Sequence, residues 1–240
     1  MGETDTGKLI KRFAELNERA ERTGIPQETK FLNIAEQSAL LGMGVPCVLF
    51  GGYDGAERRV AAIGGGENAP EIACVSIRPA AKRFAEELGH RDFLGSVMAL
   101  GVTREVLGDI IVRDNAGYLF CLPSIAPYII ENLKEVRRTS VRCEEAEPPG
   151  GAGDSAEEHV IVVASPRLDA LIAAVYRIPR EEAKSLCEKG LVYVNSRLVE
   201  KGGADVPENA AVSVRGRGRF RYIGTERTTK KGRLRVTVKY

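Results

Sequence analysis

The segment from Glu144 to His159 constrains the chain most strongly. Its sequence, EEAEPPGGAGDSAEEH, combines six acidic residues, two adjacent prolines and three glycines, with no lysine or arginine. Such a composition buries too little apolar surface to form a core, and its like charges repel one another. We therefore expect a flexible acidic linker here, assigned to residues 147–159, with separate folded domains before and after it.

The charge of the chain differs on the two sides of this segment. Residues 165–240 carry 17 Lys and Arg against 8 Asp and Glu, a net charge of +9. Residues 1–164 carry 18 basic and 25 acidic residues, a net charge of −7, so the overall value of +2 hides the division. A basic end favours a polyanionic partner. The alternative is a solvated basic tail that binds nothing.

The basic region, assigned to residues 160–240, predicts two short helices followed by a small sheet. Leu168, Leu171, Ile172 and Val175 recur at helical spacing, and Pro179 and Gly190 bound a second helix. Short apolar runs with turns between them follow at 192–195, 197–199, 211–216 and 219–224. Two helices beside a basic sheet suit double-stranded or hairpin RNA.

Arg167 and Arg180 are the strongest candidates for RNA contact. Both begin predicted helices, where guanidinium groups and backbone N–H groups can bind neighbouring phosphates. In the alternative interpretation, Arg167 pairs with Asp169 or another nearby acid, and Arg180 pairs with Glu181 or Glu182. The complete predicted RNA-binding set is Arg167, Arg180, Lys184, Asn195, Arg197, Arg215, Arg217 and Arg219.

Residues 1–69 predict a domain with helices and strands. Apolar residues recur at helical spacing over 8–22 and 27–42, and the two predicted helices are separated by Gly24-Ile25-Pro26. The segments 45–53 and 58–64 are rich in apolar residues and predict two strands joined by a turn at Asp54-Gly55.

Residues 70–146 predict a second domain with the element order βαββαβ. The pattern gives a strand at 71–77, one long or broken helix over 80–101, a hairpin over 108–122, a helix over 124–133 and a strand over 135–146. This order is that of a ferredoxin-like sandwich and of RRM domains. The hairpin places Tyr118 and Phe120 on one face, where we interpret them as core or partly exposed residues rather than as platforms for stacked bases. The fold class is therefore α+β, with three small domains.

The sequence favours a binding protein over an enzyme. The five cysteines form no CxxC pair and only two histidines are present, so neither a zinc site nor a disulfide framework is expected. His90 and Asp92 have no nucleophile or metal at a recognisable spacing, and helix capping or RNA contact suits them better. The glycine-rich turns do not form GxGxxG, so no cofactor is expected.

With no apolar run of about 18 residues and no signal sequence, we expect a cytoplasmic protein without membrane contact. The rival interpretation is an RNA-modifying enzyme of the pseudouridine synthase or rRNA methyltransferase class.

Four motifs in the basic region resemble the αL RNA-binding domain of ribosomal protein S-four. They are S-x-R-L-D at Ser165–Asp169, R-x-x-A at Arg180–Ala183, G-x-V-x-V-N at Gly190–Asn195 and S-V-R-G-x-G-R-F at Ser213–Phe220. The sequence departs from the pattern in two turns. Ser196 stands where a glycine usually follows the asparagine, and Glu208-Asn209 replaces the usual Gly-Asp.

The region before the linker is similar to the bacterial YlmH-type proteins. The matching segments are Gly24–Leu32, Phe50–Arg59 and His90–Val112. This resemblance implies an RRM-like middle domain and an αL-type domain that binds rRNA and tRNA on the large ribosomal subunit. It further implies a non-enzymatic, monomeric factor of ribosome-associated quality control. Such a factor holds peptidyl-tRNA while a partner adds a C-terminal alanine tail.

Overall fold

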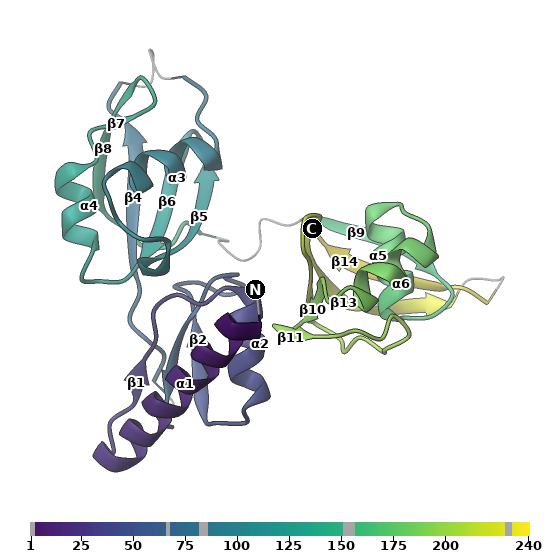
Figure 1. The fold of residues 1–240 in the computed structure, drawn as a ribbon. Helices are drawn as coiled ribbons and strands as arrows, with labels where there is room; N and C mark the ends of the chain where they lie inside the picture. The colour runs from purple at the N-terminus through teal and green to yellow at the C-terminus, as the bar shows by residue number, and fades with distance from the viewer. Residues whose placement is uncertain (1–2, 66–67, 82–85, 151–156, 229–231) are drawn as a thin grey trace. The chain divides into compact units, whose positions relative to one another are not determined.

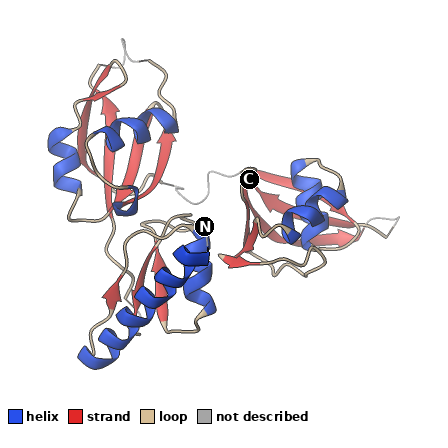
Figure 2. Ribbon diagram, viewed as in Figure 1, coloured by secondary structure: helices blue, strands red, loops and turns tan. Residues whose placement is uncertain are grey.

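The computed structural model divides the chain into two compact units, Met1–Gly153 and Asp154–Tyr240 (Figure 1). It describes residues 3–65, 68–81, 86–150, 157–228 and 232–240. Both units combine helices with antiparallel strands (Figure 2), which confirms the α+β fold class. Within the described residues, no helix is both long and apolar enough to cross a bilayer.

The first unit begins with a helix packed on a three-stranded antiparallel sheet of order β1-β3-β2. Phe13, Leu32, Leu40, Ala61 and Ile63 form the buried core between them. The elements are α1 (Glu3–Thr23), β1 (Gln27–Glu28), α2 (Ile34–Gly42), β2 (Cys47–Phe50) and β3 (Val60–Ile63).

Helix α2 starts at Ile34, so the prediction of a helix from residue 27 was wrong at its beginning. Residues Gln27–Glu28 instead pair with β3. Asn33 then caps α2: its Oδ1 accepts hydrogen bonds from the N–H groups of Ala35 (2.9 Å) and Glu36 (3.1 Å). The Glu36 carboxylate accepts the Asn33 N–H in return at 2.7 Å. This reciprocal capping box fixes the start of the helix.

The second sheet of this unit has the order β5-β6-β4-β8-β7, with α3 and α4 on one of its faces (Figure 1). The predicted βαββαβ order is confirmed, and the last predicted strand is a short hairpin of β7 and β8. Helix α3 begins only at His90, and residues 82–85 of the helix predicted from residue 80 lie outside the described residues. The elements are β4 (Ala73–Pro79), α3 (His90–Ala99), β5 (Leu107–Arg113), β6 (Ala116–Cys121), α4 (Ala126–Asn132), β7 (Glu135–Val136) and β8 (Thr139–Glu145).

A half-buried arginine joins the two sheets of the first unit. Arg58 precedes β3, yet its Nε donates to the carbonyl oxygen of Leu107 in β5 at 2.9 Å. Its Nη2 donates to the carbonyl oxygens of Phe31 and Arg104, each at 3.1 Å. Desolvation lowers the pKa of Arg58, and nearby carboxylates partly offset that effect. The guanidinium therefore connects backbone from both sheets.

Asp109 in β5 completes this junction from the other side. Its carboxylate accepts hydrogen bonds from the backbone N–H groups of Glu57 (2.6 Å) and Arg58 (3.2 Å). The Tyr53 hydroxyl donates to the same carboxylate at 3.0 Å. The loop between β2 and β3 is thus held by a side chain of the second sheet.

The second unit packs two helices on one face of a six-stranded antiparallel sheet of order β11-β10-β12-β13-β14-β9. Strand β9 pairs with β14, and these two strands were not predicted. Strand β9 starts at Glu158 and includes two residues that the sequence analysis assigned to the linker. The elements are β9 (Glu158–Val163), α5 (Leu168–Tyr176), α6 (Arg180–Glu188), β10 (Val192–Val194), β11 (Arg197–Leu198), β12 (Ala210–Val214), β13 (Gly218–Thr228) and β14 (Leu234–Lys239).

Candidate nucleic-acid interface

Arg167 is the N-cap residue of α5, and its side chain is exposed. Its backbone is extended, with φ −77° and ψ 147°, and forms an isolated bridge with Asp205. Because the helix begins at the next residue, the Arg167 side chain adds a positive charge beside the positive end of the helix dipole. A Cβ placed on Gly203 would lie 3.8 Å from Arg167 Cζ, so the guanidinium lies next to the loop before Asp205.

Arg180 forms a two-pronged ion pair with Asp169 across the two helices. Its Nε lies 2.9 Å from Asp169 Oδ2, and its Nη2 lies 3.0 Å from Oδ1. The Asp169 side chain is 10% exposed and that of Arg180 is 48% exposed. This pairing raises the pKa of Arg180. The nearly buried carboxylate orients the guanidinium, whose remaining surface faces solvent.

The pairing differs from both alternatives drawn from the sequence. Those alternatives paired Asp169 with Arg167 and paired Arg180 with the acids that follow it. In the structure Asp169 forms an ion pair with Arg180, and Glu182 forms one with Arg217 of the β12–β13 turn. Helix α5 and helix α6 pack side by side, which brings Asp169 to Arg180 although eleven positions separate them.

A glycine loop gathers these residues. The carbonyl oxygens of Gly202 and Ala204 accept the N–H groups of Asp169 (2.8 Å) and Leu168 (2.9 Å) at the start of α5. A Cβ on Gly202 would lie 3.3 Å from both Asp169 Cβ and Lys184 Cα. A side chain at this position would make tight contacts with both helices, so glycine suits the close approach of the loop. The exposed side chains of Arg167, Arg180 and Lys184 therefore surround one loop, and we call these three residues the helix–loop group.

Asn195 and Ser196 form the tight turn between β10 and β11, with φ values of 47° and 64°. The Asn195 side-chain oxygen accepts a hydrogen bond from the N–H of Ala211 in β12 at 2.9 Å, and this bond holds the turn against β12. Arg197 follows as an exposed residue opposite Val194. The turn is as predicted, but Asn195 already uses its oxygen within the protein.

The arginines of the β12–β13 hairpin form a second group. Arg215 and Arg217 are exposed and Arg219 is half-buried. The N–H of Arg215 donates to the carbonyl oxygen of Leu191, just before β10. The N–H of Asn195 donates to the carbonyl oxygen of Ala211, just after β10, so the hairpin arginines and the Asn195 turn lie at opposite ends of this strand. The predicted residues thus lie in three places: the helix–loop group, the β10–β11 turn and this hairpin.

Lys201, which was not among the predicted residues, is also exposed at the start of the glycine loop. The signal for it was the adjacent pair Gly202-Gly203, which was interpreted only as a turn. Arg177 is a further exposed cation that was not predicted; it ends α5 in the left-handed conformation, with φ 52°. Both residues add positive charge close to the two helices.

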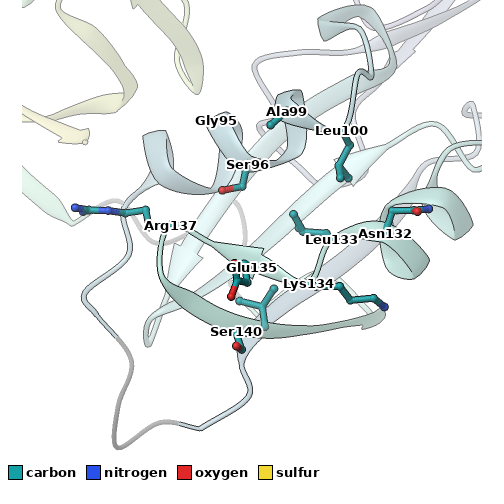
Figure 3. A pocket seen from close by; sticks show the side chains of 11 residues that line it. Gly95, Ser96, Ala99, Leu100, Asn132, Leu133, Lys134, Glu135, Arg137 and Ser140 are labelled. Atoms are coloured by element: carbon teal, nitrogen blue, oxygen red, sulfur yellow. The ribbon is translucent and has the colours of Figure 1, made fainter.

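A shallow hollow of about 750 Å³ lies on the first unit between α3 and the β7–β8 hairpin (Figure 3). Gly95, Ser96 and Ala99 line it from α3, and Lys134 lines it from the segment before β7. Arg137 at its edge pairs with carboxylates of Glu86 (3.5 Å) and Asp92 (3.7 Å). The positive charge of Arg137 is therefore partly neutralised. The residues that line the hollow are not arranged as a nucleophile with a base.

Buried thiols are poor nucleophiles in this protein. Burial raises the pKa of Cys74 to about 11 and that of Cys121 to about 12. Burial likewise raises the pKa of Cys187, in α6, to about 11. These three thiols are protonated at neutral pH, and nucleophilic attack requires the thiolate. Among the residues that the structure describes, no three His, Cys, Asp or Glu side chains gather to hold a metal ion.

The chain is similar to known proteins in sequence and in structure. Residues 67–148 match the family model described as "Putative RNA-binding domain in YlmH". The chain is 31% identical over 218 residues to the ribosome-associated protein quality control protein P2 of Bacillus subtilis (strain 168), covering 87% of this chain and 85% of that protein. A solved structure of the cell division protein ylmH from Streptococcus pneumoniae matches with a TM-score of 0.49 and 21% identity, over 64% of this chain and 96% of that one. The family match and the identity along most of both sequences confirm the predicted resemblance: this chain belongs to the YlmH family of ribosome-associated quality control proteins.

Proposed function

We propose that this protein binds structured RNA through residues 154–240 and acts in ribosome-associated quality control. The observation that carries the proposal is the helix–loop group: three exposed cations around one glycine loop, within residues 165–240, whose net charge is +9. The quality-control role is supported by the name of the Bacillus subtilis relative, which matches along most of both chains.

The geometry suits phosphate binding in two respects. Asp169 fixes the Arg180 guanidinium through two hydrogen bonds, so little side-chain entropy is lost when its exposed side meets a phosphate. Arg167 stands at the N-terminus of α5, where the helix dipole favours an anion. Arg177 and Lys201 extend the positive surface around these two positions.

The proposal includes a specific place of action. We propose that the bound RNA is rRNA and tRNA of the large ribosomal subunit, and that the protein acts as a cytoplasmic monomer. In this proposal it holds peptidyl-tRNA while a partner adds alanine residues to the stalled chain. The description of the model matched by residues 67–148 supports a second RNA contact on the first unit.

Co-sedimentation of the full chain with ribosomal subunits tests the proposal. Arg167→Ala and Lys184→Ala each remove one cation from the helix–loop group, and Arg227→Ala removes one exposed cation from β13 as the matched control. A charge-assisted contact contributes about 1.5–3 kcal/mol, so each test variant should bind about 10- to 150-fold more weakly at about 1.4 kcal/mol per decade. The control should co-sediment normally.

Each lost phosphate contact should also reduce the slope of log affinity against log salt by about one. Normal co-sedimentation of both test variants with the large subunit would place the ribosome contact elsewhere and contradict the proposal. If Arg227→Ala weakened ribosome binding equally, binding would depend only on the total charge of the protein and not on the helix–loop group.

A further inference from the structure

The second sheet of the first unit has a face that carries neither α3 nor α4. Side chains alternate along β6, so Leu119 and Cys121 lie in the core under the helices, while Tyr118 and Phe120 lie on the opposite face. Phe120 is fully buried there against Tyr53, with ring centroids 4.8 Å apart. Tyr118 remains partly exposed. Of the two aromatic residues, Phe120 is core, as interpreted, and Tyr118 is available to a ligand.

A pocket of about 380 Å³ lies on this face around Tyr118. Arg78 of β4 and Arg113 of β5 line it from either side of β6. Arg78 Cζ lies 5.9 Å from the centre of the Tyr118 ring, within the range of a cation–π contact. Asp114 at the β5–β6 turn is the acidic residue of the lining. The pocket therefore offers an aromatic ring between two guanidinium groups.

Both arginines already contact the acidic segment of the same chain, Arg78 through an ion pair and Arg113 through a hydrogen bond. The Glu144 carboxylate lies 3.4 Å from Arg78 Nη1. The segment then leaves β8, and the carbonyl oxygen of Gly150 accepts a hydrogen bond from Arg113 Nη1 at 2.5 Å. Between these points the Ala146 N–H donates to the Cys74 carbonyl at 2.9 Å. Residues 144–150 thus run from the β4 side of the sheet toward β5, and we call them the acidic strap.

One residue of the strap and one residue of the neighbouring strand β4 are buried. Pro149 within it is buried. Ser76, whose backbone pairs with Tyr118, is fully buried, and its hydroxyl has no hydrogen-bond partner among the described residues.

We propose that this pocket is a binding site for single-stranded RNA, and that the acidic strap competes for it. A base would stack on Tyr118, and a backbone phosphate would bind Arg78 and Arg113 in place of the Glu144 carboxylate and the Gly150 carbonyl. An aromatic ring flanked by guanidinium groups matches the base and phosphate of one nucleotide. An acidic peptide would match the arginines but would leave the ring without a stacking partner. The site does not depend on the helix–loop group.

Photo-crosslinking of the full chain to a short oligouridylate that contains 4-thiouridine tests this site. The crosslinked peptide, identified by mass spectrometry, should contain Tyr118. A saturating unlabelled hairpin RNA should leave this crosslink in place, because the hairpin occupies residues 154–240. Crosslinks confined to residues 154–240 would overturn the proposal without affecting the proposed function.

Three variants define the contacts by fluorescence anisotropy of the labelled oligouridylate, with hairpin RNA present throughout. Tyr118→Leu keeps apolar bulk and should weaken binding about 5- to 150-fold, the range for removing one stacked base. Arg78→Gln, which does not alter the ring, should weaken it as well. Glu144→Gln should strengthen binding because it releases Arg78 from the strap.

Two outcomes would refute the site. The first is unchanged affinity in Tyr118→Leu and Arg78→Gln. The second is displacement of the oligouridylate by oligoglutamate at lower concentration than by unlabelled oligouridylate, which would assign the pocket to an acidic peptide. Binding of hairpin RNA should be the same in all three variants, so failure here remains separate from failure of the helix–loop surface.

Discussion

Replacing Arg180 by alanine should destabilise the second unit even though the arginine is half-exposed. The substitution removes both hydrogen bonds from Asp169, whose side chain is only 10% exposed, and leaves its carboxylate without its partner. Losing charge-assisted hydrogen bonds costs about 1.5–3 kcal/mol. Solvent reaches the Arg180 side of the pair and screens it, so we expect a destabilisation around and below the lower end of this range, about 1–2 kcal/mol.

The sequence alone led to a different expectation for this residue. There, Arg180 was expected to contact phosphate or to pair with Glu181 or Glu182, and neither contact joins the two helices. It does begin α6 at an exposed position, but its side chain turns back to α5. A double variant of Arg167→Ala with Arg180→Ala therefore combines loss of RNA contact with loss of stability.

Thermal and urea unfolding of residues 154–240 measure the effect. A domain of this size changes its Tm by about 4–8 °C per kcal/mol, so Arg180→Ala should lower Tm by about 4–16 °C. Arg167→Ala, an exposed N-cap without a side-chain cap, should change the unfolding free energy by no more than about 0.5 kcal/mol. Asp169→Asn in both backgrounds completes a double-mutant cycle. If Arg180→Ala unfolds like the parent and the cycle gives no coupling energy, the ion pair contributes nothing and the reasoning is refuted.

Three further predictions concern binding, catalysis and backbone strain. Residues 154–240 alone should bind hairpin RNA with an affinity that falls about 10³-fold or more between 50 and 200 mM salt if roughly six phosphates are contacted, and residues 1–145 should bind it far more weakly; filter binding at several salt concentrations checks both. Purified protein incubated with rRNA, with or without S-adenosylmethionine, should leave neither methylated bases nor pseudouridine by mass spectrometry. Arg177→Gly should raise the unfolding free energy by about 0.5–1 kcal/mol, because φ is 52° there and glycine adopts this conformation readily; an unchanged or lower urea midpoint would show that the arginine makes a compensating contact.

Patterns that depend on neighbouring residues were predictable from the sequence. The periodic apolar residues of α5, the proline before α6 and the hairpin over 108–122 all depend on local sequence, and the structure has each where it was predicted. The βαββαβ order followed because six such elements appear in sequence. Local signals also competed: Gln27–Glu28 lies in an apolar-periodic stretch, yet pairing with β3 determines its conformation.

The features that could not be predicted depend on contacts between distant residues. Strand β9 follows the acidic segment and is a strand because β14, more than seventy residues later, supplies its hydrogen-bond partners. The choice of Arg180 rather than Arg167 by Asp169 depends on how α5 packs against α6. The course of the strap depends on Arg78 of β4 and Arg113 of β5, which contact the Glu144 carboxylate and the Gly150 carbonyl. None of these pairings leaves a period or a spacing in the sequence.

The junction between Arg58 and Asp109 also bears on the order in which the chain is synthesised. These residues are 51 positions apart, and the loop between β2 and β3 obtains its hydrogen bonds from the later one. At about 5–20 residues per second, ribosomes would complete the first sheet several seconds before β5 emerges. During that interval the Arg58 guanidinium would have to remain hydrated, with two of its three carbonyl acceptors not yet in place. The N-terminal sheet therefore reaches its final structure only when the neighbouring sheet is made, although its own core residues are all synthesised earlier.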